Sequence, residues 1–463
     1  MKTSAKVLAA TIAAVVSVSA WAAAPSIETV NMTWNESRTE ATISYTLANA
    51  PAVVTLDIID GSDASIGGAY IGASVSGDVF RKVATDGDHE ILWHPSTGDF
   101  KLPAGGVRAV VTAYPLDDTP DYMVVSAANH PAGSADLVRY YPGEDFLPGG
   151  LHKNREYKSS KIVMRRIRAK DVEWTMGSSS VEESAFDKWT LPVNESNHVV
   201  RLTNDYYLAV FETTHGQHLC LTGGIAPSVV DSANFLVSWT DRPVEQAYYL
   251  NLRGATQWPD APAEGSALGV IRSRTGIDFD LPGEAQWEFA CRAGLGEGVW
   301  NTGAAYSAQY AYYKEYNASG NNTYNGFHWW VGASIPGRCS TTEGRIAVND
   351  NFYDVARASI GTTNGTAIVG SYPASAWGLY DMHGNVSELT LDFYKEDISA
   401  LNGAVCSDSS SGNRVIRGGS IESRGVIDCR AAARSTVGYT GTDNGDRWAY
   451  TVGYRLCCRN GLK

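Results

Sequence analysis

The first part of the chain alternates apolar and polar residues, and this period of two constrains its fold more than any other sequence feature. The clearest stretches are Ala41–Leu47, Val53–Ile59 and Gly106–Tyr114. Turn signals such as Asp60-Gly61 separate the alternating stretches. Short alternating runs between regular turns are typical of antiparallel strands. We therefore expect an all-β sandwich over residues 23–130.

Beyond the sandwich the pattern changes. Residues 131–159 begin with a stretch rich in Pro and Gly, and we interpret them as a linker. From 160 to 463 the chain is rich in Trp, Tyr and Gly, and its elements are short and irregular. The sandwich at 23–130 resembles immunoglobulin-like modules through its Gly87–Pro95 stretch, and His89 and His94 are expected to be strand residues without a metal.

The N-terminus has the three parts of a removable export signal. Met1, Lys2 and Lys6 form a basic start, Val7–Val18 is apolar, and small residues lead to Ala20-Trp21-Ala22. A membrane anchor would need roughly 20 apolar residues. We therefore interpret residues 1–22 as a signal peptide and expect export to the periplasm, the cell surface or the medium. No later stretch is long and apolar enough to predict a transmembrane segment.

Cysteine usage and charge restrict the function further. The chain has seven cysteines, an odd number, and no C-x-x-C pair. Outside the cytosol cysteines tend to pair, so one sulfur is left over unless it bonds to another chain. The net charge of −13 argues against nucleic acid as a partner, because phosphate binding needs a basic face.

One local segment is basic. Eight Lys or Arg lie between Lys153 and Lys170, including Arg165, Arg166 and Arg168 around an apolar run. This pattern favours a solvated edge strand guarded by cations. An anionic surface as partner is the alternative.

Seven blocks follow one another in the second part of the chain. They are Trp174–Gly177, Asn204–Thr214, Arg242–Gln246, Leu281–Gly294, Gly378–Glu388, Arg417–Ser420 and Gly453–Arg455. Together they resemble the formylglycine-generating enzyme, or sulfatase-modifying factor, family. The resemblance covers residues 160–463 and implies an irregular α+β fold of the C-type-lectin-like kind.

Two further sequence patterns can be interpreted from physical principles alone. Leu281-Pro282 followed by Glu284 and Glu288 indicates a helix start, so both carboxylates are interpreted as structural rather than as an acid/base pair. His215 and His218 are three residues apart, but no further ligand completes a metal motif. We expect these two histidines at the surface.

The Gly378–Glu388 block predicts a calcium site. Asp381, Asn385 and Glu388 supply hard oxygen ligands at close spacing, and the His383 carbonyl can add another. The resemblance implies calcium at the corresponding positions. An Asx-turn that caps the next segment is the alternative.

The same resemblance implies copper(I) on two cysteines after the R-G-G-S turn, and here the pattern departs from the family. The two positions fall at Ser423 and near Val426 or Ile427, although Ser420 is retained. The tryptophan of the family's pocket is replaced by Ser387. Copper(I) prefers soft thiolate ligands, so we do not expect it here.

Cys429 is then interpreted as a structural crosslink. It lies in a Cys-Arg-Ala-Ala block shared with relatives that lack the copper pair, and its natural partner is Cys291. Closing a loop of well over a hundred residues contributes roughly 4–5 kcal/mol in the chain-entropy model.

The function predicted from these residues is binding rather than catalysis. Short polar residues between aromatic rings are typical of a recognition surface for a peptide, protein or glycan. The residues expected on this surface are Ser387, Ser420, Ser423, Arg424, Tyr439 and Trp448. Two alternatives stay open: an oxidoreductase related to the family with a displaced site, and a structural cell-surface component.

Overall fold

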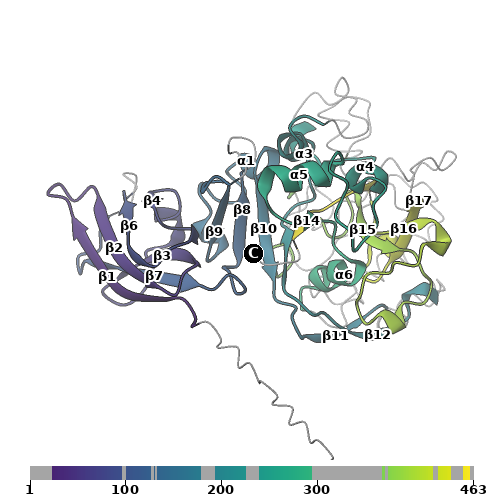
Figure 1. Cartoon of the computed structure of the whole chain (residues 1–463), viewed down its shortest axis with the longest axis horizontal. Coiled ribbons are helices and arrows are strands. Elements are labelled where there is room, and N and C mark those ends of the chain that lie inside the picture. The colour runs from purple at the N-terminus through teal and green to yellow at the C-terminus, as the bar shows by residue number, and fades with distance from the viewer. Residues whose placement is uncertain are drawn as a thin grey trace, which may run out of the picture.

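The computed structural model confirms an α+β chain with a β-sandwich at one end (Figure 1). It describes residues 23–95, 101–126, 130, 133–178, 193–225, 239–294, 366, 368–370, 374–420, 426–438 and 452–458. No helix in these ranges is both long enough and apolar enough to cross a membrane.

The sandwich consists of two antiparallel sheets, ordered β1-β2-β6-β4 and β5-β3-β7. Its strands are β1 (Ser26–Trp34), β2 (Ala41–Ala48), β3 (Ala52–Asp60), β4 (Val75–Gly77), β5 (Arg81–Val83), β6 (Gly87–Trp93) and β7 (Val107–Tyr114). Alternation in β2 buries Ile43, Tyr45 and Leu47, as the sequence predicts. The core also holds Trp93, whose indole N–H donates to the Tyr70 carbonyl at 3.1 Å.

A six-stranded sheet in the order β14-β19-β13-β10-β8-β9 lies at the centre of the molecule. Its strands are β8 (Tyr122–Val125), β9 (Val138–Tyr141), β10 (Ile162–Ile167), β13 (Tyr206–Ala209), β14 (Phe279–Asp280) and β19 (Cys457–Cys458). One face continues the sandwich core through Val124 and Val163, and the other packs Met164 and Tyr207 in a separate core.

The expected linker is part of this sheet. Residues 131–159 contain β9 and the helix α1 (Glu156–Ser159), and they bury Leu147 and Tyr157. The strand β8, which the sequence assigns to the sandwich, pairs with β10 from the second part of the chain. The boundary therefore runs through a shared sheet, because β8 and β9 complete their hydrogen bonds there.

The prediction of an edge strand in the basic segment is wrong. β10 lies inside the sheet, paired with β8 on one side and β13 on the other. Its arginines contact carboxylates of the neighbouring segments instead of guarding an edge: Arg166 bonds Asp118 and Asp205, each at 2.7 Å.

Most of the remaining elements lie beyond the sheet, on the side away from the sandwich (Figure 1). The helices are α3 (His215–Thr222), α4 (Tyr249–Arg253), α5 (Ala267–Thr275) and α6 (Glu284–Arg292). The other strands are β11 (Glu173–Met176), β12 (His198–Arg201), β15 (Ser387–Phe393), β16 (Asn413–Arg417), β17 (Arg434–Gly438) and β18 (Val452–Gly453). Two short 3₁₀ turns, η1 (Gly68–Tyr70) and η2 (Glu144–Phe146), lie on the sandwich side and pack against each other. The other 3₁₀ turns are η3 (Val193–Glu195), η4 (Trp239–Asp241), η6 (Ser399–Leu401), η7 (Ser409–Ser411) and η8 (Val426–Cys429).

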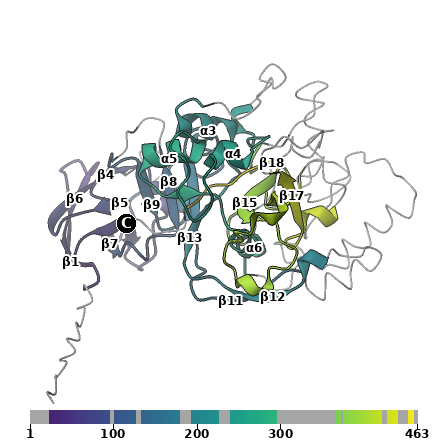
Figure 2. The same ribbon diagram turned by 45° about the vertical axis from the view of Figure 1, so that its right-hand side comes forward.

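Two groups of these elements position the candidate site. The helices α3, α4 and α5 lie together on one side of the molecule (Figure 2). On another side, α6 packs against the sheet ordered β17-β16-β15-β18. The predicted helix start is confirmed: α6 begins just after Pro282, with Gly283 at the N-cap.

Candidate functional site

The R-G-G-S turn at the end of β16 packs closely against the core. Gly418 and Gly419 have φ of 90° and 69°, a left-handed conformation that suits glycine. A Cβ on Gly418 would lie 3.1 Å from the Trp287 ring. The Gly384 N–H donates to the Gly418 carbonyl at 2.8 Å. The turn thereby fixes the position of Ser420, which precedes the two positions where the family resemblance implies copper ligands.

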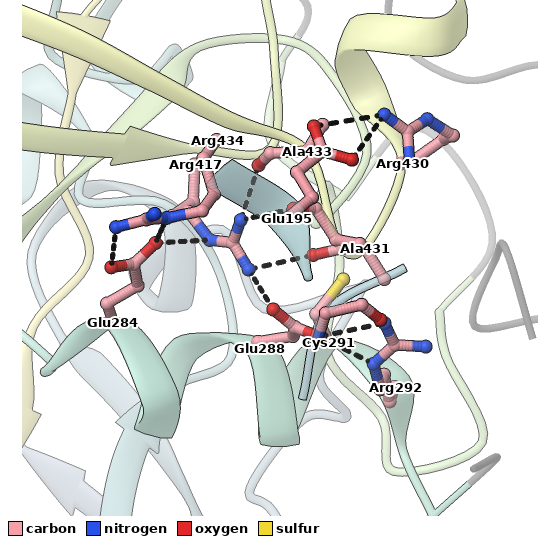
Figure 3. Close-up of polar contacts among 12 residues, drawn as sticks. Glu195, Glu284, Glu288, Cys291, Arg292, Arg417, Arg430, Ala431, Ala433 and Arg434 are labelled. Atoms are coloured by element: carbon pink, nitrogen blue, oxygen red, sulfur yellow. Dashed lines mark hydrogen bonds and ion pairs between the residues drawn. The ribbon is translucent and has the colours of Figure 1, made fainter. Parts of the chain in front are cut away.

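Arg417 ties the start of this segment to its end (Figure 3). Its side chain is fully buried and donates to the carbonyls of Ala431, Ala432 and Ala433, at 3.0 Å to the first and 2.8 Å to the second. It also forms an ion pair with Glu288. One guanidinium therefore holds both β16 and the chain that returns after residue 429.

The helix α6 supplies the carboxylates of this network. Glu284 bonds Arg434 at 2.6 Å, and Glu288 bonds Arg292 at 2.7 Å (Figure 3). Burial alone would raise the pKa of Glu288, but Arg292 and Arg417 hold that pKa below its usual value. Both glutamates are buried and ion-paired, in agreement with the structural interpretation.

A second pair fixes the far end of the segment. Arg430 forms hydrogen bonds with both oxygens of Glu195, at 3.1 and 2.8 Å, and both side chains are buried. His383 donates through Nδ1 to the Cys429 carbonyl at 2.8 Å. Arg417, before the turn, and Arg430 are thus both held by buried charge-assisted hydrogen bonds, which are stronger than neutral ones.

The two cysteines of the predicted crosslink lie on either side of His383. The Cys291 Sγ is 3.7 Å from the Nε2 of His383, whose Nδ1 bonds the Cys429 backbone. Burial raises the pKa of Cys291 well above its usual value and lowers the pKa of His383 to about 4. The described residues contain no disulfide between these sulfurs, so the pairing stays a prediction.

Asp381 and Asn385 precede β15 and Glu388 lies on it, and these predicted calcium ligands have different contacts. Glu388 accepts from Arg455 at 2.6 Å and from the Trp287 indole at 2.7 Å. The Asn385 side-chain amide donates to Glu212 at 2.6 Å. Asp381 accepts from the Gly370 N–H at 2.7 Å through one oxygen.

The fit of this turn to calcium is therefore partial. The second oxygen of Asp381 is buried and has no hydrogen-bond partner among the described residues, and burial raises the pKa of this carboxyl to about 6. The arginine already neutralises Glu388. Among the described residues no group of three or more His, Cys, Asp or Glu is placed to hold a metal. Calcium at this turn stays a prediction.

Glu212 is a buried functional candidate that sequence reasoning missed. It is fully buried and accepts from the side chain of Asn385 and from the Val386 N–H. Burial, together with Asp381 and Glu388, raises its pKa well above the usual value. The carboxylate lies within the Asn204–Thr214 block, but nothing in that block indicates that it meets a turn so distant in the chain.

The expectation of surface histidines at His215 and His218 is wrong. Both side chains are buried on α3, and burial lowers the pKa of each to about 4. His218 Nδ1 contacts the Tyr454 hydroxyl at 2.7 Å. A capping box between Thr214 and Gln217 begins the helix, and its packing buries both imidazoles.

Comparison with known proteins identifies the second part of the chain. The sulfatase-modifying factor enzyme 1-like domain matches residues 147–459. The chain belongs to this family. The family match starts at residue 147, and the expected domain start at 160 stays a prediction.

Solved structures and curated proteins add little to the family assignment. PvdO from Pseudomonas aeruginosa is 19% identical with a TM-score of 0.43, covering 64% of this chain and 94% of its own. Treponema denticola variable protein 1 is 19% identical with a TM-score of 0.38, covering 65% of this chain and 96% of its own. CarF is 14% identical with a TM-score of 0.32, covering 65% of this chain and 99% of its own. No curated protein matches.

The structure places only part of the predicted recognition surface in this sulfatase-modifying factor domain. Ser420 follows the turn and is 2% exposed, and Ser387 begins β15 and is 8% exposed. Val426 begins η8. The other four members lie outside the described residues, namely Ser423, Arg424, Tyr439 and Trp448.

Proposed function

We propose that this protein is an exported, non-catalytic binding module built on the sulfatase-modifying factor fold. One observation carries the proposal: buried arginines hold the chain on both sides of the segment 420–429, but the segment lacks the paired sulfur ligands. Arg417 and Arg430 anchor its two ends. A segment held on a rigid scaffold is where proteins commonly place recognition residues.

The donor set does not fit copper. Copper(I) prefers two soft thiolates, and the corresponding positions carry Ser423 and Val426. Among the described sulfurs, Cys291 is fully buried, and its raised pKa keeps it a thiol. A buried, protonated thiol is neither a good metal ligand nor a nucleophile. These residues therefore support binding rather than oxygen activation.

The ligand we propose is a peptide, a protein or a glycan. Tyr439 and Trp448 lie in a stretch where aromatic rings alternate with Gly, Thr and Asn. Rigid rings supply contact area at low entropic cost, and short polar groups supply adaptable hydrogen bonds. Export, inferred from residues 1–22, would present this surface outside the cytosol.

The first experiment tests catalysis. The mature protein is incubated with copper and a sulfatase peptide that carries the substrate cysteine, and the peptide mass is then measured. We expect an unchanged peptide. Conversion of the cysteine thiol to an aldehyde would overturn the non-catalytic proposal.

The second experiment tests the recognition surface on glycan and peptide arrays. The double variant Tyr439→Ala/Trp448→Ala should lose capture of peptides and neutral glycans while keeping the melting temperature of the parent. Tyr70→Ala, in the sandwich, is the matched control and should retain capture. If the double variant unfolds, the two rings belong to the core and the proposed surface is wrong.

A further inference from the structure

A cleft of about 370 Å³ lies at the junction of the sandwich and the central sheet, and no function described above uses it. One wall comes from the sandwich, at Gly72 and Val75. On the side of the central sheet, the lining includes Ser126, which follows β8, and Arg139 on β9. It also includes Lys161, the residue that precedes β10 in the chain. Ligand sites occur preferentially at such domain junctions, and this volume lies at the lower end of their range.

Aromatic rings form the apolar part of the lining. Phe80 and Tyr141 pack with ring centroids 5.0 Å apart, and both are buried with Tyr157. The Tyr157 hydroxyl donates to the Pro148 carbonyl at 3.1 Å. The Tyr141 hydroxyl has no hydrogen-bond partner in the described part of the chain, and burial raises its pKa to about 12, so it remains a donor.

The polar part of the lining is rich in donors. The Ser126 hydroxyl, like that of Tyr141, has no partner among the described residues. Lys161 contacts Glu156 at 2.7 Å and keeps two further N–H donors. Arg139 uses one nitrogen on the Val79 carbonyl at 2.9 Å and another on Asp136. His130 also lines the cleft.

The cleft offers few charged acceptors. Asp136 is the one carboxylate among the described lining residues, and one of its oxygens is ion-paired with Arg139. Glu156 lies outside the lining and is held by Lys161. A ligand that enters therefore meets more unused donors than acceptors, which favours a group that only accepts hydrogen bonds.

The walls are held in place without a ligand. Arg139 bonds the Val79 carbonyl across the junction, and the Tyr140 N–H donates to the Phe80 carbonyl at 2.7 Å. Gly72 approaches so closely that a Cβ there would lie 1.8 Å from the Phe146 carbonyl oxygen. A preformed cleft loses little ordering entropy when a ligand binds.

From this geometry we infer that the junction cleft binds a monosaccharide-sized ligand that carries an oxyanion, either a carboxylate or a sulfate. The oxyanion accepts from Lys161, from Tyr141 and from Ser126. The apolar part of the sugar ring packs against the aromatic lining. This site is separate from the proposed recognition surface and does not depend on it.

The experiment is titration calorimetry of the mature chain with galacturonate, galactose 6-sulfate and neutral galactose. We expect saturable binding of one or both anionic sugars, weakened by salt, and no saturation by galactose. The two anionic arms show which oxyanion the cleft prefers. Lys161→Gln and Tyr141→Phe should each weaken binding by about tenfold or more, since each removes a donor to a charged group.

Controls separate this site from loss of structure and from the proposed function. Lys170→Gln changes an exposed lysine outside the cleft and should bind like the parent. Tyr439→Ala/Trp448→Ala should also keep the affinity for the anionic sugar. Equal binding of galactose and the anionic sugars, no binding of any of them, or full affinity in Lys161→Gln with a parental melting temperature would each overturn the inference.

Discussion

Replacing Arg417 by methionine tests whether the buried network supports the segment 420–429. The guanidinium is fully buried, pairs with Glu288 and satisfies the carbonyls of three consecutive alanines. Methionine has a similar length but no donor. It would leave one Glu288 oxygen and three carbonyls buried with fewer partners.

The expected cost follows from the burial of these groups. Removing one partner of a buried ion pair costs about 3–5 kcal/mol, because the remaining charge stays out of water. Glu288 keeps Arg292, which favours the lower end of this range. Arg417→Lys should be intermediate, because an ammonium keeps the charge but cannot spread its donors as the planar guanidinium does.

Unfolding in guanidinium chloride, followed by tryptophan fluorescence, measures the loss in free energy of unfolding. Trp287 lies beside Arg417 and reports on the network. Hydrogen exchange should accelerate in β17, where the anchored chain continues. Arg108→Met is the control: its ion pair with Asp63 joins side chains that are 61% and 76% exposed, so about 0–1 kcal/mol is expected. If Arg417→Met loses no more stability than this control, the network does not support the segment.

Three further predictions concern the crosslink, the calcium turn and the buried histidines. A non-reducing tryptic map of the exported protein should contain a linked peptide with Cys291 and Cys429, and alkylation of both sulfurs without reduction would contradict the pairing. Chelation should lower the melting temperature of the parent but not of Asp381→Asn; equal responses would exclude calcium at Asp381. His215 and His218 have a folded pKa of about 4 against the ordinary 6.5, so their contribution to stability is present above pH 6.5 and is lost as the pH falls toward 4. Each contributes about 3 kcal/mol at most, so His215→Gln/His218→Gln should flatten the dependence of unfolding free energy on pH, and an unchanged slope would refute this reasoning.

Local patterns in the sequence determined the elements that depend on near neighbours. Alternation in Ala41–Leu47 predicts β2, since a strand with one buried face needs a period of two. Proline and acidic residues after Leu281 predict the start of α6, because the first helical turn has free N–H groups. The order of the seven blocks in the sequence indicates the family, and the family match confirms it.

The tertiary structure decided which partners these elements meet. An apolar run flanked by arginines predicts a strand at Ile162–Ile167, but its interior place in the sheet depends on β8 and β13, which are distant in sequence. His215 and His218 are polar in any sequence pattern, and only the packing of α3 buries them. Glu212 meets Asn385 because two distant segments are brought together in the core. Burial and pairing are properties of non-local contacts, so a one-dimensional pattern specifies which surface an element can bury but not the neighbour that covers it.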